Sequence, residues 1–440
     1  MTQWRCRFMR GLLPAILALL LVPFASRNAA EGAQNVPPEG FTAIFSGRDL
    51  AGWHGLVGNP KTRATMTPEQ LAAARDKANE TMRKHWRAEG GDIVNDGHSP
   101  HLCTDKPYGD FEMWIDWKIV PKADSGIYLR GTPQVQIWDP VAGIAQAKVG
   151  SGGLYNNRKH TSKPTVVADN PAGEWNTFWI RMVGEITSVK LNGKTTADNV
   201  PLENYWDRTR PIYPAEQIEL QTHGGEIRFR NIFLREIGPD DANAFLQKLG
   251  DEGFEPLFNG RDLDGWQGSV DGYLVENGVL ICDPKKGGTI LTKAEYGDFA
   301  VRFEFKLPPG GNNGLGIRTP PTGNPAYVGM EIQILDDSAE KWKNLKPYQY
   351  HGSIYGVVPA HRGYLRPVGQ WNFEEVVCNG SRVTVSVNGT VIVDADLATI
   401  DKPMDGNDHP GLKRASGHIG FMGHGDRVEF RNIRVKRLEK

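Results

Sequence analysis

The sequence has no surplus of charge of either sign. Its 440 residues carry 51 Lys and Arg against 52 Asp and Glu, which gives a formal net charge of −1. Nucleic-acid-binding proteins usually carry a basic face, and acidic tails appear as runs of like charge. Neither feature is present, so the composition does not favour a nucleic-acid partner. No nicotinamide or flavin motif is recognisable either, which predicts that the chain binds neither cofactor.

Cysteines and long apolar runs are also scarce. Only Cys103, Cys282 and Cys378 remain once Cys6, near the N-terminus, is set aside. An odd number of thiols in strand-like stretches excludes a disulfide framework and predicts buried, unreactive side chains. After residue 40 no apolar stretch is long enough for a membrane span.

The N-terminus has the pattern of an export signal. Arg5, Arg7 and Arg10 precede an apolar stretch at 11–25, and small residues follow it. This pattern predicts a signal peptide over residues 1–33 and a mature protein in the periplasm or outside the cell. An uncleaved membrane anchor is the alternative interpretation.

The chain contains the same unit twice. GFTAIFSGRDLAGW at 40–53 and GFEPLFNGRDLDGW at 253–266 are identical at nine of fourteen positions. Further matching blocks follow in the same order, and both copies end in a segment containing FRNI. We therefore predict two homologous domains, residues 40–237 and 252–440. The segment 238–251 between them has an apolar stripe typical of a short linker helix.

Alternating polarity predicts that both domains are built from β-strands. In VRFEFKL, Val301, Phe303 and Phe305 face one side, while the charged residues face the other. Asn-Gly pairs at 192–193 and 388–389 favour tight hairpins. These features, with 51 Gly and 29 Pro, predict two antiparallel β-sandwiches. A helix at 67–86, absent from the second copy, is expected to cover a sandwich edge or the lip of a groove.

The ordered blocks resemble the 3-keto-disaccharide (3-keto-glycoside) hydrolase domain family. Both halves carry its opening motif G-F-x-x-L-F-N-G-x-x-L-x-G-W almost completely, followed by S-G-x-x-x-R, E-x-Q-I-x-D, W-N, L-N-G and H-G-x-x-x-F-R-N-I. The resemblance covers about residues 40–237 and 252–440. It implies a concanavalin A-like jelly-roll fold and cleavage of sugars already oxidised at C3.

Each copy departs from the family pattern at one position. Gln134 stands in the first copy where the family has a glutamate, and Met422 stands in the second where the first has Gln221. Either copy is therefore a candidate for lost or altered activity.

Cleavage of a 3-keto-glycoside by elimination needs a base near C2, a stabiliser of the enolate oxygen and a proton donor for the leaving group. Strand alternation places polar side chains that could perform these tasks on one exposed face of each sandwich. The catalytic candidates are Glu331, His424 and Arg318 in the second copy, and His223 and Arg130 in the first. The substrate-binding candidates are Gln136, Gln333, Gln134, Gln221, Tyr155, Trp138 and Tyr355.

No cofactor follows with certainty from the sequence. A divalent cation is one candidate stabiliser of the enolate in the first copy, and His223, His101 and Asp139 are the candidate ligands. The expected partner is a carbohydrate, and a separate sugar 3-oxidoreductase would have to supply the keto group.

Three functional hypotheses remain open. The first is a secreted enzyme that cleaves 3-keto-glycosides by elimination and hydration. The second is a lectin-like protein with two sugar-binding sandwiches, because the same fold serves binding proteins. The third combines them, with one copy catalytic and the other binding the sugar.

Overall fold

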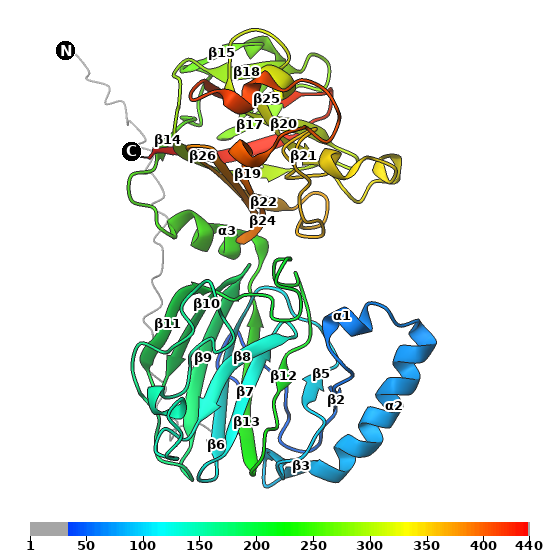
Figure 1. The fold of residues 1–440 in the computed structure, drawn as a ribbon, viewed down its shortest axis with the longest axis vertical. Coiled ribbons are helices and arrows are strands. Elements are labelled where there is room, and N and C mark those ends of the chain that lie inside the picture. The colour runs from blue at the N-terminus through cyan, green and yellow to red at the C-terminus, as the bar shows by residue number, and fades with distance from the viewer. Residues whose placement is uncertain (1–33, 439–440) are drawn as a thin grey trace, which may run out of the picture. The chain divides into compact units, whose positions relative to one another are not determined.

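The computed structural model describes residues 34–438, which form two β-sandwiches connected by a helix (Figure 1). Each sandwich pairs an eight-stranded sheet with a five-stranded sheet. This architecture confirms the prediction of two tandem jelly-roll sandwiches. The predicted export signal, residues 1–33, lies outside the described residues. Among residues 34–438, no helix is both long and apolar enough to cross a membrane.

The first sandwich contains strands β1 to β13. Its larger sheet has the order β11-β10-β9-β6-β13-β4-β3, with β1 paired to β13, and its smaller sheet has the order β2-β5-β12-β7-β8. The strands are β1 (Thr42–Ala43), β2 (Trp53–Gly55), β3 (Trp86–Glu89), β4 (Asp92–Asn95), β5 (Leu102–Thr104), β6 (Phe111–Ile119), β7 (Asp124–Leu129), β8 (Thr132–Trp138), β9 (Asn176–Val183), β10 (Ile186–Leu191), β11 (Lys194–Pro201), β12 (Glu219–Leu220) and β13 (Ile227–Glu236).

The second sandwich repeats this topology. Its larger sheet has the order β16-β17-β26-β19-β22-β23-β24, with β14 paired to β26, and its smaller sheet has the order β15-β18-β25-β20-β21. The strands are β14 (Glu255–Pro256), β15 (Trp266–Gly268), β16 (Tyr273–Glu276), β17 (Val279–Cys282), β18 (Gly288–Thr292), β19 (Phe299–Lys306), β20 (Asn312–Thr319), β21 (Met330–Leu335), β22 (Trp371–Asn379), β23 (Arg382–Val387), β24 (Thr390–Asp396), β25 (His418–Gly423) and β26 (Glu429–Arg437). Equivalent strands occupy equivalent places, as a duplicated unit requires.

The core of each sandwich follows from the period-two pattern of its strands. On β19, Val301, Phe303 and Phe305 are fully buried between the two sheets. Glu304, on the opposite face, is buried as well, because the linker helix α3 (Pro239–Lys248) packs there and Asn243 donates a hydrogen bond to its carboxylate at 3.0 Å. The linker helix is thus part of the packing of the second sandwich.

The helix predicted in the first copy is α2 (Pro68–His85), and it begins with a reciprocal cap. The Thr67 hydroxyl accepts from the Gln70 backbone N–H at 3.3 Å, and the Gln70 side chain accepts from the Thr67 backbone N–H at 2.9 Å. The Asn79 side chain accepts from the backbone N–H of Gly55 on edge strand β2 at 2.9 Å. The helix therefore covers a sheet edge, as predicted.

Both predicted Asn-Gly turns are present. Asn192 and Gly193 join β10 to β11, Asn388 and Gly389 join β23 to β24, and all four have positive φ. The remaining helical segments are short: α1 (Pro60–Arg63), α4 (Pro325–Val328), η1 (Ala147–Val149), η2 (Val270–Gly272), η3 (Glu340–Trp342), η4 (Pro347–Gln349), η5 (Leu397–Thr399) and η6 (Pro410–Lys413). The three cysteines after residue 40 are free and buried, as expected.

Candidate functional site

The face of the smaller sheet that is turned away from the core of the second sandwich carries a compact polar group. On β21, Met330, Ile332 and Ile334 point into the core, so alternation directs Glu331 and Gln333 to the opposite face. The backbone N–H of Gln333 donates to the carbonyl of Ser353, and that of Tyr355 donates to the carbonyl of Glu331. The loop after β21 therefore borders this polar face.

Glu331 and His424 form an ion pair on this face. Oε1 of Glu331 lies 3.8 Å from Nε2 of His424, and the two side chains are 7% and 47% exposed. The interaction with the Glu331 carboxylate outweighs burial and raises the pKa of His424 above its usual value. The buried Glu331 carboxylate and the half-exposed imidazole of His424 thus lie side by side, on the one face where the sequence placed them.

Glycines form the floor beside this pair. Gly316 pairs with Glu331 across β20 and β21, and Gly420 on β25 pairs with Gly316. Gly314 has no room for a side chain, because an added Cβ would lie 2.2 Å from Oε1 of Glu331. Three neighbouring positions on one face thus lack side chains, and the Glu331 carboxylate lies over one of them.

Gln333 is fixed in one orientation near this floor. Its side-chain N–H groups donate to Oδ1 of Asn312 at 2.7 Å and to the carbonyl of Asn313 at 3.1 Å. The amide oxygen of Gln333 is therefore the group left to accept a hydrogen bond. Met422, which replaces the Gln221 of the first copy, is buried against the same floor beside Gly316.

Two tyrosines, Tyr355 and Tyr327, are further polar candidates for this site. The Tyr355 hydroxyl accepts from the side chain of Gln349 at 3.1 Å, so its own proton is available to another acceptor. Burial raises the pKa of the Tyr327 hydroxyl, and the nearby Tyr355 and Asp405 raise it further. Glu331 acts on this pKa in the same direction, but less than the other groups. Sequence reasoning missed Tyr327 because it lies on the short helix α4, outside the alternating strands.

The first sandwich assembles the equivalent side chains differently. The Gln136 amide donates to Oδ1 of Asp124 at 2.7 Å, and the Gln134 amide donates to Oε1 of Gln136. Nδ1 of His223 lies 3.5 Å from Oδ2 of Asp124, whose pKa is raised by burial. Gln134, Gln136 and His223 therefore belong to one connected group, but its only carboxylate is on Asp124, already bonded to Gln136.

A cavity of about 380 Å³ opens beside this group, lined by Gln136, Trp138, Tyr155, Lys163 and others. The rings of Trp138 and Tyr155 meet edge to face with centroids 5.2 Å apart. Trp138 is buried, whereas Tyr155 is exposed. Aromatic rings with amide and ammonium groups beside them are suited to holding a sugar ring.

The three predicted metal ligands of the first copy do not form one cluster. His101 accepts from the backbone N–H of Thr222 at 3.2 Å, and burial, with the nearby His223, lowers its pKa to about 4. Asp139 accepts from the backbone N–H groups of Lys122 and Val141, which makes it a turn residue. Gln221 donates to the Tyr128 hydroxyl at 3.4 Å, on the same face as His101.

Arg130 and Arg318 do not line these faces, which corrects the sequence-based expectation. Nη2 of Arg318 lies 2.9 Å from Oδ1 of Asp298, and its other N–H groups donate to three backbone carbonyls. Its side chain is only 3% exposed. Arg130 is bound in the same way to Asp110 and to the carbonyls of Gly109 and Tyr213. Both side chains are buried and held by these bonds, so neither guanidinium lines the polar face.

A comparison with protein families gives a match to both sandwiches. The model described as 3-keto-alpha-glucoside-1,2-lyase-like domain matches residues 40–235 and again residues 253–436. The chain belongs to this family. The predicted relationship is therefore confirmed, and the family domain occurs twice in tandem.

The relatives found by comparison match about one copy each. A 3-keto-disaccharide hydrolase of Bacteroides thetaiotaomicron is 24% identical over 230 residues, 43% of this chain and 79% of the relative. Two provisionally named glycosyl hydrolases of Parabacteroides distasonis with solved structures are 32% and 27% identical. The first match covers 42% of this chain and 99% of the solved chain, with a TM-score of 0.39. The second covers 43% of this chain and 96% of the solved chain, with a TM-score of 0.37.

The first domain also contains a buried acid that sequence reasoning did not select. Glu219 lies on the central strand β12, pairs with Cys103 and Tyr128, and is 1% exposed. Neither of its carboxylate oxygens has a hydrogen-bond partner, and the nearest cation, Nη2 of Arg63, is 3.9 Å away. Burial raises its pKa to about 8. Strand alternation in residues 218–224 (IELQTHG) could have indicated Glu219, because it places this residue on the same face as His223.

Next to Glu219, the side chains of Cys103, His54 and Asp105 form a chain of polar contacts. Sγ of Cys103 lies 3.2 Å from Nε2 of His54, and Nδ1 of His54 lies 2.7 Å from Oδ1 of Asp105. The thiol is fully buried, and burial together with the charge of Glu219 raises its pKa. A thiol held in its neutral form is a poor nucleophile. We therefore interpret this chain of contacts as structural.

Proposed function

We propose that the protein cleaves 3-keto-glycosides by elimination and hydration, and that the second sandwich is the catalytic one. The observation that carries this proposal is the Glu331–His424 pair beside a glycine floor. A base and a proton donor 3.8 Å apart match the needs of elimination from a 3-keto sugar.

The reaction begins with removal of the C2 proton by the Glu331 carboxylate. The ketone at C3 acidifies this proton, because the electron pair is delocalised onto the keto oxygen. Expulsion of the group at C1 then forms the C1=C2 double bond and breaks the C1–O bond. The imidazolium of His424 donates its proton to the departing oxygen, which leaves as an alcohol. Addition of water across the double bond gives the free 3-keto sugar, so the net reaction is hydrolysis.

Hydroxyl groups stabilise the enolate in this scheme in place of the arginine first expected. The Tyr355 hydroxyl accepts from Gln349, so its proton can be donated to the keto oxygen. Tyr327, whose pKa Tyr355 and Glu331 also raise, is a second donor. Gln333, whose nitrogen is engaged, offers its amide oxygen to a sugar hydroxyl.

We assign sugar binding to the first sandwich. Gln134 replaces the glutamate of the family pattern there, which removes the base, while the cavity with Trp138 and Tyr155 offers a stacking surface. Two sandwiches on one chain would then hold a glycoside near the catalytic domain by raising its local concentration. A purely lectin-like protein is the competing interpretation, and turnover separates the two.

The expected setting is the periplasm or the cell exterior, in keeping with the N-terminal pattern. Because no nicotinamide or flavin motif is present, a separate sugar 3-oxidoreductase would supply the substrate. A divalent cation in the catalytic step stays a proposal, tested by adding and removing metal in the same assay.

The test is incubation of the purified protein with a 3-keto-glucoside, followed by NMR of the products. We expect an enone intermediate or the free 3-keto sugar, together with the released alcohol. Substrate that persists with and without added divalent metal would contradict the proposal. Saturable binding of the intact glycoside without turnover would favour the lectin-like alternative.

A further inference from the structure

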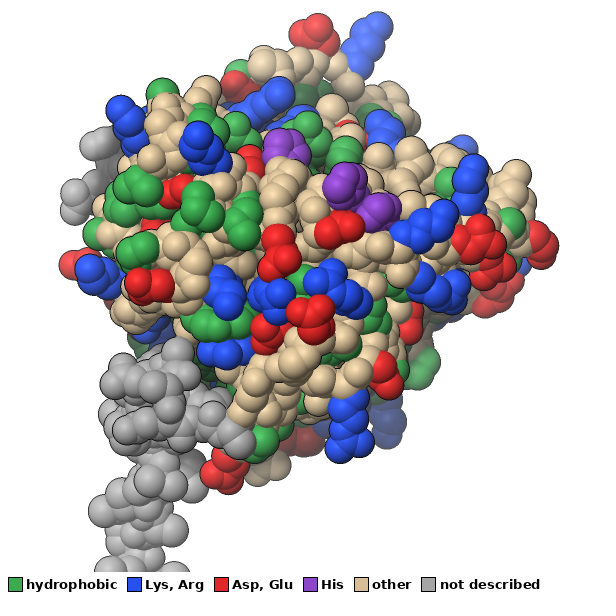
Figure 2. Space-filling view, turned by 90° about the horizontal axis from the view of Figure 1, so that it is seen from below, with side chains coloured by type: hydrophobic (Ala, Val, Ile, Leu, Met, Phe, Trp, Pro, Cys, Tyr) green, Lys and Arg blue, Asp and Glu red, His purple; other side chains and the backbone are tan. Residues whose placement is uncertain are grey.

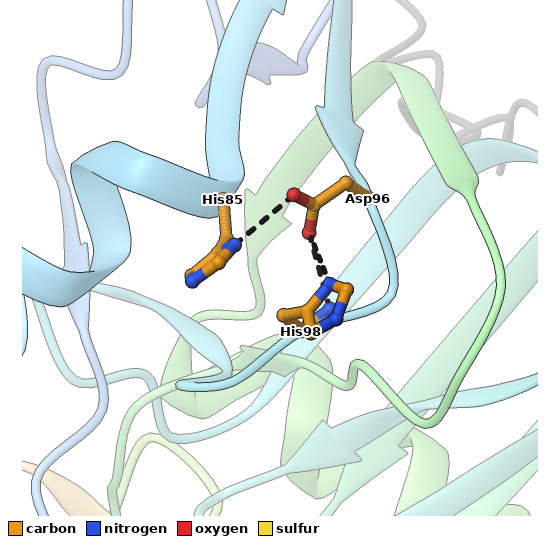
Figure 3. A group of neighbouring side chains, drawn as sticks. All are labelled: His85, Asp96 and His98. Carbon is orange, nitrogen blue, oxygen red and sulfur yellow. Dashed lines mark hydrogen bonds and ion pairs between the residues drawn. The ribbon is translucent and has the colours of Figure 1, made fainter.

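His85, Asp96 and His98 come together in the first sandwich, where the chain runs from α2 into β3 and β4 (Figure 3). The β3–β4 hairpin explains their proximity. Trp86 pairs with Asn95, so the preceding His85 and the following Asp96 are opposite each other, and the backbone N–H of Asp96 donates to the carbonyl of His85 at 3.3 Å. His98 follows in the next turn.

Both imidazole side chains direct a nitrogen toward the Asp96 carboxylate. Nδ1 of His85 lies 3.0 Å from Oδ2 of Asp96, and Nδ1 of His98 lies 3.1 Å from Oδ1 of the same carboxylate (Figure 3). One nitrogen or oxygen from each residue falls within 4.8 Å of the other two. The imidazole rings stack with centroids 5.1 Å apart. Zinc holds such ligands at about 2.0–2.2 Å, so small side-chain rotations suffice to enclose an ion.

The loop that carries Asp96 and His98 is held by contacts of its own. The Asn95 side chain donates to the carbonyl of His98 at 3.0 Å and accepts from the backbone N–H of Gly97 at 2.7 Å. Gly97 has a φ of 97°, and an added Cβ would lie 2.6 Å from the backbone nitrogen of Gly225. Because the backbone is fixed independently of any ion, little ordering entropy opposes binding.

We propose that His85, Asp96 and His98 form a binding site for a divalent transition-metal ion of the Zn²⁺ type. Two imidazole nitrogens and one carboxylate suit Zn²⁺ and its neighbours, whereas Mg²⁺ and Ca²⁺ prefer sites made of oxygen. Three protein ligands leave at least one coordination position open. The side chain of His98 is 70% exposed, so water or a ligand oxygen can reach this position. Histidine side chains are seen at the surface of the face shown in Figure 2.

The site adjoins the polar face of the first sandwich. The Thr222 hydroxyl donates to Oδ1 of Asn95 at 2.6 Å, and Thr222 also contacts His101 and precedes His223. A bound ion would therefore fasten the end of α2 to the loop that borders this face. The second sandwich has no counterpart, because the chain there passes from β15 to β16 through the short η2 alone. The proposal does not depend on catalysis by Glu331.

The experiment is calorimetric titration of the EDTA-treated full-length protein with Zn²⁺, followed by Co²⁺ absorption spectra to count and identify the ligands. We expect one ion per chain, with Mg²⁺ failing to compete. His85→Ala, Asp96→Asn and His98→Ala should each weaken binding at least tenfold. His98 is mostly exposed, so its replacement leaves the fold intact, which the thermal unfolding temperature without metal would verify.

His160→Ala provides the matched control. Nδ1 of His160 lies 3.3 Å from Oε1 of Glu203, a histidine–carboxylate pair that is part of no such three-residue group among the described residues. This variant should bind Zn²⁺ like the unaltered protein. The proposal is overturned if His98→Ala and His160→Ala weaken binding equally, if the double variant His85→Ala with His98→Ala retains full affinity, or if no saturable one-to-one binding occurs.

Discussion

Gln134 of the first sandwich and Glu331 of the second occupy equivalent positions. Each lies on the edge strand of its five-stranded sheet, and each side chain lies against a glycine of the neighbouring strand, Gly126 and Gly314 respectively. The exchange of a carboxylate for an amide at this position removes the group that can accept a proton. In the proposed reaction, this difference is the reason for placing the base in the second sandwich.

Glu331→Gln is therefore expected to lower kcat on a 3-keto-glucoside by roughly a hundredfold or more, because loss of a general base costs about 10²–10⁴ in rate. The control is Glu295→Gln. Oε1 of Glu295 lies 3.9 Å from Nε2 of His418, which is a similar pair in the same sandwich, but its carboxylate is about half exposed. Steady-state rates should fall only for Glu331→Gln, and equal losses in both variants would contradict the assignment.

The pH dependence of the reaction should report His424. Its pKa is raised mainly by Glu331, so the imidazolium persists above the usual titration range of histidine. If this cation donates the proton to the leaving group, activity is lost as the pH rises through the raised pKa. NMR titration of the His424 ring should give a lower pKa in Glu331→Gln than in the unaltered protein. An unchanged pKa would show that the two side chains do not interact in solution.

Much of the fold and part of the site could be predicted from strand alternation. The period of two placed Val301 and Phe303 in the core, and it placed Glu331 and Gln333 together on the opposite face. Alternation predicts the direction of a side chain correctly as long as the strand is regular. It could not find Tyr327, whose position depends on a short helix outside the alternating strands.

Strand alternation gave the wrong side-chain direction for Arg130 and Arg318, because each lies at an irregularity in its strand. A register shift separates Gly316 from Thr319, and Arg318 between them has a φ of 47°. Arg130 has the same φ, and a register shift precedes it between Ile127 and Leu129. A bulge changes the direction of a side chain, so the phase of the preceding residues no longer applies.

Arg318→Ala should therefore reduce stability without a selective effect on catalysis. Removal of one partner of a buried ion pair costs about 3–5 kcal/mol, because Asp298 would be left without its cation. We expect a lower midpoint of urea unfolding and an unchanged kcat per folded molecule at low temperature. A loss of kcat at unchanged stability would restore the catalytic role that the sequence suggested.

Glu219→Gln should stabilise the protein, and the gain should depend on pH. The folded-state pKa of Glu219 is raised to about 8, so the native protein keeps a proton that the unfolded chain releases near pH 4.5. Between these values the unfolded state binds fewer protons, and stability falls with rising pH by up to about 1.4 kcal/mol per pH unit for this group. The neutral glutamine does not titrate. Its advantage should therefore be small at pH 5, grow toward pH 8 and then level off.

Glu216→Gln is the matched control for this measurement. Glu216 is a neighbouring carboxylate, with Oε2 2.9 Å from Nη2 of Arg63, so its neutralisation breaks an ion pair instead of relieving a buried charge. Calorimetric unfolding at several pH values should show Glu216→Gln less stable than the unaltered protein above pH 5, opposite in sign to Glu219→Gln. If both variants shift the unfolding temperature in the same direction, Glu219 is not held as a neutral acid beneath the face of the first sandwich.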